Sequence, residues 1–216
     1  MKKKRLKVLE LFSGTGKISQ AFAARGHEVF RVDWNTSFDA ELHCDISKLT
    51  AQEILEKFGK PDVIWASPDC TTFSVAAISH HRKQNPVNGS LEPITEYARF
   101  CDECDQHVIE LIRELNPTYW FIENPRGGMR KMAWMQELPR YTVTYCKYGE
   151  KRMKPTDIWT NHPDPQFLPP CKNGDPCHER APRGARTGTQ GIRGWDNRSA
   201  IPAMLCEHIV DICEEE

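Results

Sequence analysis

One cysteine and one glutamate stand where a folded chain can use them for covalent and acid–base chemistry. Cys70 lies in the stretch SPDCTTFS, residues 67–74, directly after the apolar run of residues 62–66. Its polar neighbours argue against plain hydrophobic packing, and backbone N–H groups exposed at a turn favour the nucleophilic thiolate. Glu123 follows the apolar run 119–122, where partial burial raises a carboxyl pKa and permits proton donation. The two residues predict nucleophilic catalysis assisted by a general acid.

Glycines and an acidic residue after two earlier strands indicate a nucleoside cofactor. The SGTG turn, residues 13–16, follows the first apolar run, and glycines let a backbone approach a cofactor closely. The turn is not a phosphate-binding P-loop, because Ile18 stands where that motif requires Ser or Thr. Asp33 ends the second expected strand, where a carboxylate can accept both ribose hydroxyls of a nucleoside. Either NAD or S-adenosylmethionine satisfies this pattern.

A third group of reactive side chains lies in a Pro- and Gly-rich stretch nearer the C-terminus. Cys171, Cys177 and His178 fall close together, and His162 precedes them. Thiolates and imidazoles are the ligands that zinc prefers, and a metal would order a loop that has no apolar core of its own. These four residues form a candidate zinc site, with free thiols as the alternative. Residues 182–191, which are basic and rich in Gly, suit phosphate contacts or a flexible linker.

The elements that must position these residues alternate between apolar strands and amphipathic helices. Strands buried on both faces, with helices between them, form a parallel α/β sheet, and the last two strands predict an antiparallel edge. Ligands bind such sheets at the carboxyl ends of the strands, where the polar residues described above fall. We expect strands at 7–12, 27–32, 62–66, 119–122, 141–146 and 156–160, helices at 17–24, 51–58, 97–115, 128–135 and 201–214, and a loop at 80–93.

Composition excludes several other classes of protein. The chain has 216 residues, 27% of them charged, and a formal net charge of -1, which disfavours collagen-like and disordered chains. No apolar run approaches the roughly 20 residues of a membrane span. Nine cysteines, an odd number, without a signal-like N-terminus argue against a secreted disulfide framework and favour the cytoplasm. Residues 125–154 carry eight Lys and Arg against two Glu, which is compatible with a polyanionic partner.

The motifs LFSGTG, VD, CDI, SPDCTTFS, ENP and YGEKRMK, in this order, resemble those of the cytosine-5 DNA methyltransferases. The resemblance covers most of residues 8–154, and a weaker match at 197–201 resembles the family's last motif. It implies a Rossmann-like fold and S-adenosylmethionine as cofactor, with Asp33 on the ribose, Trp34 against the adenine, and Asp45 and Ile46 at the adenine edge. The implied cofactor pocket as a whole consists of Phe12, Ser13, Gly14, Gly16, Asp33, Trp34, Asp45, Ile46 and Pro68.

The resemblance also implies three catalytic roles. Cys70 would attack carbon 6 of cytosine, Glu123 would contact ring nitrogen 3 and the exocyclic amine, and Arg152 would bind near the target nucleotide. Thiolate addition at carbon 6 makes carbon 5 nucleophilic, and a base inside a duplex must be flipped out to be reached. Residues 80–93 would be a mobile loop that closes over the substrate.

The chain departs from the family pattern beside the cysteine and in its length. Asp69 replaces the usual Pro before the cysteine, and its negative charge opposes formation of the thiolate. Thr71 replaces the usual Gln, and only Arg152 of the family's QxRxR pattern carries over. We expect a catalytic and cofactor-binding domain at 1–154, a much reduced target-recognition insert with the candidate zinc loop at 155–196, and a C-terminal helix at 197–216 that packs back on the catalytic domain.

The expected function is transfer of a methyl group from S-adenosylmethionine to carbon 5 of cytosine in DNA through a covalent Cys70 adduct, with no membrane partner. Three alternatives stay open at this stage. The first is the same chemistry on RNA, such as tRNA, or on a free cytosine nucleotide. The second is a catalytically silent relative that binds nucleic acid, and the third is an NAD oxidoreductase.

Overall fold

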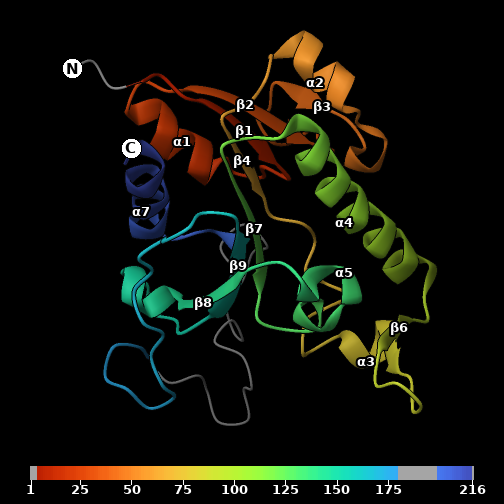
Figure 1. The fold of residues 1–216 in the computed structure, drawn as a ribbon. Coiled ribbons are helices and arrows are strands. Elements are labelled where there is room, and N and C mark those ends of the chain that lie inside the picture. The colour runs from red at the N-terminus through yellow and green to blue at the C-terminus, as the bar shows by residue number, and fades with distance from the viewer. Residues whose placement is uncertain (1–3, 180–198, 216) are drawn as a thin grey trace.

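A seven-stranded sheet forms the centre of the protein in the computed structural model, which describes residues 4–179 and 199–215 (Figure 1). The strand order is β3-β2-β1-β4-β7-β9-β8. Strand β9 runs antiparallel to both of its neighbours, β7 and β8, and the other strand pairs of the sheet are parallel. The expected mostly parallel sheet with an antiparallel edge is therefore confirmed. The strands are β1 Lys7–Leu11, β2 Glu28–Asp33, β3 Leu42–His43, β4 Val63–Ala66, β7 Tyr119–Pro125, β8 Arg140–Thr144 and β9 Pro155–Thr160.

Helices cover both faces of this sheet. The main ones are α1 Lys17–Ala24, α2 Ala51–Lys57, α4 Glu96–Leu115 and α7 Ala203–Glu214, with the shorter α5 at Ala133–Gln136. The pair α1 and α7 covers one face, and α2 and α4 cover the other (Figure 1). Successive side chains of a strand point to opposite faces. In β1, Val8 therefore packs in the core under α1 and α7, whereas Leu9 and Leu11 pack in the core under α2 and α4.

The long helix α4 begins and ends where its sequence provides caps. The Thr95 hydroxyl accepts a hydrogen bond from the backbone N–H of Ala98, 3.2 Å away, which satisfies a free donor of the first turn. Asn116 then takes the left-handed conformation, with φ 44°, and ends the helix ahead of Pro117. The expected helix over 97–115 is confirmed to within one residue.

The segment 80–93 differs from the loop that we expected. It contains the end of helix α3, Ile78–His81, and an antiparallel hairpin of β5, Arg82–Gln84, and β6, Leu91–Pro93. These strands are short and polar, so the apolar alternation that signals a strand is missing.

Arg82, the first residue of β5, connects this hairpin to α4 and to the loop after β4. The residue is 3% exposed, and its guanidinium group bonds Asp102 of α4 at 2.6 and 3.1 Å. It also donates to the Thr72 carbonyl oxygen at 3.1 Å and lies 4.0 Å from the centre of the Phe73 ring. The hairpin is thus tied to the loop that carries Cys70.

Several smaller differences lie between the expected elements. Residues 128–135 form a 3₁₀ turn at Met129–Lys131 followed by α5, and β8 gives way to another 3₁₀ turn at Tyr145–Tyr148. Strand β3, only two residues long, was not expected. Within 4–179 and 199–215, none of the helices has the length and apolar character that crossing a bilayer requires.

Candidate active site

The turn after β1 is held against the end of β2 by Asp33. Its carboxylate accepts hydrogen bonds from the backbone N–H groups of Gly14, at 2.8 Å, and Asn35, at 2.9 Å. Gly16 has φ +64° at the start of α1, a conformation that favours glycine. Asp33 is only 4% exposed, so in this structure its charge fixes the shape of the turn.

A cavity of about 420 Å³ opens beside this turn at the carboxyl ends of the strands. Four of the nine residues that the family resemblance assigns to the cofactor pocket line it: Phe12, Trp34, Asp45 and Ile46. The other five are not among the lining residues. Ser13, Asp33 and Pro68 each adjoin a lining residue in the sequence, and Gly14 and Gly16 belong to the turn after β1.

The opposite wall of the cavity comes from α4, and the sequence analysis did not find it. Tyr97, Phe100, Cys101, Cys104 and Asp105 line it. The apolar members belong to the helical stripe that predicted a core-facing helix. Tyr97 is 42% and Phe100 43% exposed, because the stripe faces the cavity at this end of the helix.

Asp105 gives this wall a polar group without a protein partner. The side chain is 4% exposed, and its Oδ2 atom has no hydrogen-bond partner. Burial raises the pKa of Asp105 well above its usual range, with the nearby charge of Asp102 acting in the same direction. A protonated Asp105 can donate a hydrogen bond to a ligand. Apolar walls with a few polar groups and one unpaired carboxyl oxygen fit a purine nucleoside such as that of S-adenosylmethionine.

Cys70 lies in the loop after β4, next to Asp69, which lines the cavity. Asp69 accepts hydrogen bonds from the Thr71 backbone N–H and, at 2.9 Å, from the Tyr97 hydroxyl. Burial raises the pKa of the Cys70 thiol to about 11, and the charges of Asp69 and Glu123 add to the effect. The expectation that this turn favours a thiolate is therefore wrong for the free protein, whereas the expected opposition from Asp69 is confirmed.

Glu123 lies near the end of β7 with its side chain buried. It is 5% exposed, and its Oε1 accepts a hydrogen bond from the Tyr145 hydroxyl at 3.2 Å. Burial raises the pKa of Glu123, as expected, while the positive charge of Lys154 acts against the rise. The Glu123 charge also raises the pKa of Cys70. The neighbouring Asn124 amide donates to the Pro68 carbonyl oxygen at 3.0 Å, which holds the end of β7 against the loop that carries Cys70.

Lys154 is a third member of this site, and the sequence analysis missed it. It is 5% exposed, and its Nζ lies 4.5 Å from the centre of the Tyr145 ring. Burial lowers the pKa of Lys154, and the negative charges of Glu123 and the Cys70 thiolate counter this. Its position in the YGEKRMK motif could have indicated Lys154, because this Lys stands in place of the second Arg of the family pattern.

Arg152 stands at the edge of the same site. Its guanidinium group makes two hydrogen bonds with the Glu150 carboxylate, at 2.6 and 2.8 Å. Its positive charge contributes to the lowered pKa of Lys154, which places the two side chains within electrostatic reach. The charges of all three residues that we expected to be catalytic thus influence the pKa of Lys154.

The expected metal ligands are only partly brought together. Cys171, Cys177 and His178 form a group, but the fourth member is Cys146 and not His162. His162 packs elsewhere: its Nε2 pairs with the Ile212 carbonyl oxygen at 3.0 Å, and its Nδ1 accepts from the Asp164 N–H at 3.2 Å. The basic stretch 182–191 and the residues Asn197 and Arg198 lie outside the described residues.

Comparison with known proteins adds an independent line of evidence. No family model matches the chain. A protein of frog virus 3 (isolate Goorha), named probable DNA (cytosine-5)-methyltransferase, is 28% identical over 223 residues, which cover 96% of this chain and 100% of the relative.

Two solved structures share the fold. The S. pombe Dnmt2 methyltransferase matches with a TM-score of 0.51 and 19% identity, over 72% of this chain and 50% of that one. The Entamoeba histolytica methyltransferase EhMeth matches with a TM-score of 0.51 and 16% identity, over 83% of this chain and 58% of that one. This chain therefore spans about half the length of these structures.

The sheet order, the cavity at the strand ends and the structural matches define the fold of the Rossmann-like S-adenosylmethionine-dependent methyltransferases. Within that class, the viral relative confirms the resemblance to the cytosine-5 methyltransferases that the sequence motifs indicate.

Proposed function

We propose that this chain transfers a methyl group from S-adenosylmethionine to carbon 5 of cytosine, with DNA as substrate and Cys70 as nucleophile. The observation that supports the proposal is the mutual electrostatic influence of Cys70, Glu123 and Lys154: the Glu123 charge raises the pKa of Cys70, and the Lys154 charge lowers the pKa of both. Asp69, the neighbour of Cys70, lines the 420 Å³ cavity, so the loop that carries Cys70 borders the candidate cofactor site.

S-adenosylmethionine supplies an electrophilic methyl group when it is bound. Trp34, Asp45 and Ile46 would hold its adenosine part, together with the α4 wall around Asp105. The side chains of Phe12 and Asp69 extend the same cavity toward the loop that carries Cys70.

The protein's own residues activate the base. The Cys70 sulfur forms a bond to carbon 6, and the electrons of the carbon 5–carbon 6 double bond move to carbon 5. Glu123, whose raised pKa keeps it available as an acid, stabilises the developing charge by sharing its proton with ring nitrogen 3. Carbon 5 would take up the methyl group as the bond between that group and the cofactor sulfur breaks, which leaves a neutral thioether. When a base then removes the carbon 5 proton, the double bond re-forms and Cys70 leaves as a thiolate. Lys154 stabilises both anionic side chains.

The proposed substrate is a polynucleotide because the stretch 125–154, which carries Arg152, contains eight Lys and Arg residues. Lys154 is buried, and three others pair with carboxylates, so the residues that suit phosphate contacts are Arg126, Lys131, Arg140 and Lys147. The full-length match to a relative named as a probable DNA methyltransferase favours DNA. Residues 155–160 of the expected insert form β9 of the central sheet, so the insert begins at residue 161. It is short for a DNA-reading domain, and this keeps RNA as the competing substrate of the same chemistry.

The test measures transfer of labelled methyl groups from S-adenosylmethionine to duplex DNA, tRNA and dCMP. We expect 5-methylcytosine in DNA with the wild type, none with Cys70→Ser, and unchanged transfer with Cys213→Ser, whose buried thiol lies on α7. Transfer to tRNA and not to DNA would refute DNA as the substrate and leave the proposed mechanism unchanged. Undiminished transfer by Cys70→Ser would refute the covalent mechanism.

A further inference from the structure

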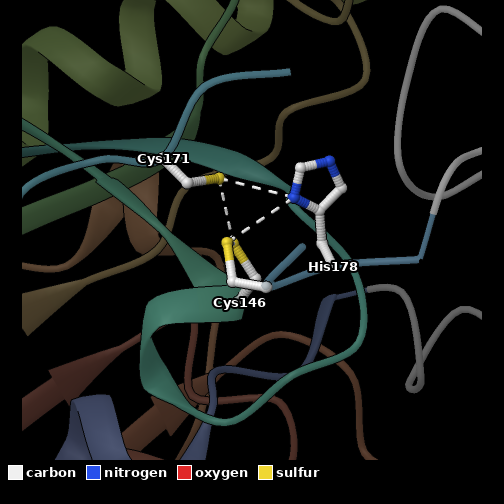
Figure 2. A group of neighbouring side chains, drawn as sticks. Cys146, Cys171 and His178 are labelled. Carbon is white, nitrogen blue, oxygen red and sulfur yellow. Dashed lines mark hydrogen bonds between the residues drawn. The ribbon is translucent and has the colours of Figure 1, made fainter. Parts of the chain in front are cut away.

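We propose that Cys146, Cys171, Cys177 and His178 bind one Zn²⁺ ion, which fastens the first part of the insert to the end of strand β8. The side chains of Cys146, Cys171 and His178 point toward one another from two distant parts of the chain (Figure 2). With Cys177 included, the four ligand atoms all lie within 4.8 Å of one another. This site does not depend on the proposed function.

Three of the distances between these atoms match the edges of a zinc-centred tetrahedron. Zinc bonds of about 2.3 Å to sulfur and about 2.05 Å to nitrogen require edges of about 3.8 Å between two sulfurs and about 3.6 Å between sulfur and nitrogen. The His178 Nδ1 atom lies 3.6 Å from the Cys171 sulfur and 3.8 Å from the Cys177 sulfur. The Cys177 and Cys146 sulfurs are 3.7 Å apart. The Cys146–Cys171 edge, at 3.1 Å, has to widen when the ion binds.

Neighbouring hydrogen bonds hold the ligands in place from both sides. The Cys171 backbone N–H donates to the Thr144 hydroxyl of β8 at 3.0 Å, and Cys146 lies in the 3₁₀ turn directly after this strand. The Lys172 N–H donates to the Asp175 carboxylate at 2.7 Å, which shapes the turn between Cys171 and Cys177. Such support beyond the ligands themselves is typical of metal sites.

A bound metal ion would hold residues 161–179 in one structure, which they have no apolar core of their own to do. Residues 161–179 contain no helix or strand, and most of their side chains are exposed or half-buried. Segments without a core of their own need cross-links or metal ions to take one structure. Three cysteines and one histidine fill all four positions of a tetrahedron, so no position remains for water or substrate, and the ion is structural.

The position of the zinc site relates it to the candidate active site. Just after His178, the Glu179 backbone N–H donates to the Lys151 carbonyl oxygen at 2.8 Å. An ion pair of 3.1 Å between the side chains of the same two residues reinforces this contact. Lys151 directly precedes Arg152 in the sequence. The zinc ion would therefore hold the loop of residues 171–179 beside the segment that carries Arg152.

The test begins with the metal content of the whole chain, purified without chelators or added metal. We expect about one zinc per chain by mass spectrometry in the wild type and in Cys213→Ser, and at least a tenfold loss of zinc affinity in Cys177→Ser. Cys177 is only half-buried, so its replacement leaves the core intact. Zinc-free wild type that also fails to take up added zinc would overturn the proposal.

Cobalt replacement keeps the test decisive even if Cys177→Ser fails to fold. Co²⁺ added to the metal-free wild type should give the visible absorption bands of a tetrahedral site with thiolate ligands, and zinc should abolish them. Octahedral bands alone would overturn the proposal. So would a Cys146–Cys171 disulfide, found by peptide mapping, in protein purified without oxidant.

Discussion

Replacing Asp69 by Asn should make Cys70 more nucleophilic in the free protein. Burial, with the charges of Asp69 and Glu123, raises the pKa of Cys70 to about 11. At pH 8 this leaves roughly one thiol in a thousand ionised. Asp69 is the largest electrostatic contributor after burial, and Asn keeps its size while removing its charge.

The size of the effect follows from Coulomb's law. Two unit charges about 7 Å apart, a separation typical of neighbouring side chains, interact by roughly 1 kcal/mol at an effective dielectric constant of about 40. This value allows for screening by water, because Asp69 is exposed. An energy of this size corresponds to a little under one pKa unit, so the thiolate fraction should rise about fivefold to tenfold.

The assay is alkylation by iodoacetamide at pH 8, with the peptide that contains Cys70 quantified by mass spectrometry. Asp69→Asn should react about fivefold to tenfold faster at Cys70 than the wild type, whereas Asp69→Glu, which keeps the charge, should react at nearly the wild-type rate. Cys213, buried on α7, serves as the internal reference. If Cys70 reacted at the same rate in Asp69→Asn and in the wild type, the electrostatic reasoning would be refuted. An equal acceleration at Cys213 would refute it as well.

Three further predictions concern buried charges. Arg82→Met should lower the free energy of unfolding by about 3–5 kcal/mol in urea titrations, because it leaves the buried Asp102 carboxylate without its partner. Adding Asp102→Leu should restore most of the lost stability. Burial raises the pKa of Glu10 from 4.5 to about 7, so the folded state retains a proton that the unfolded state releases. The wild type should therefore lose about 3 kcal/mol of stability as pH rises from about 4.5 to 7, and Glu10→Gln should lack this loss in urea titrations at several pH values. In calorimetry, Asp105→Asn, which keeps a hydrogen-bond donor, should bind S-adenosylhomocysteine within about threefold of wild type, and Asp105→Leu about tenfold more weakly.

Most of the fold could be predicted because its elements have clear periodicity. Strand β4 is a continuous apolar run, and α4 has apolar residues at helical spacing, so both follow from burial alone. The hairpin of β5 and β6 could not be predicted, because its strands are short and polar and depend on the buried Arg82 for their anchor.

The candidate site could be predicted where it lies at strand ends. Parallel strands bring their carboxyl ends to one edge of the sheet, so Asp33, Cys70 and Glu123 were expected near one another. Trp34 and Asp45 were expected there only from the family resemblance. The α4 wall was missed, because an apolar stripe does not show whether it faces a core or a cavity. Cys146 was missed as a ligand, because only the folding of the insert against the end of β8 brings it to Cys171.

The most direct test of the central claim is covalent trapping on DNA that contains 5-fluorocytosine. A base can remove hydrogen from carbon 5 as a proton but cannot remove fluorine in this way, so the bond between carbon 6 and Cys70 cannot break after methyl transfer. In the presence of S-adenosylmethionine, we expect an adduct that peptide mapping assigns to Cys70 and that Cys70→Ser does not form. An adduct on another cysteine, or methylation of unmodified DNA without trapping on the fluorinated strand, would contradict the account.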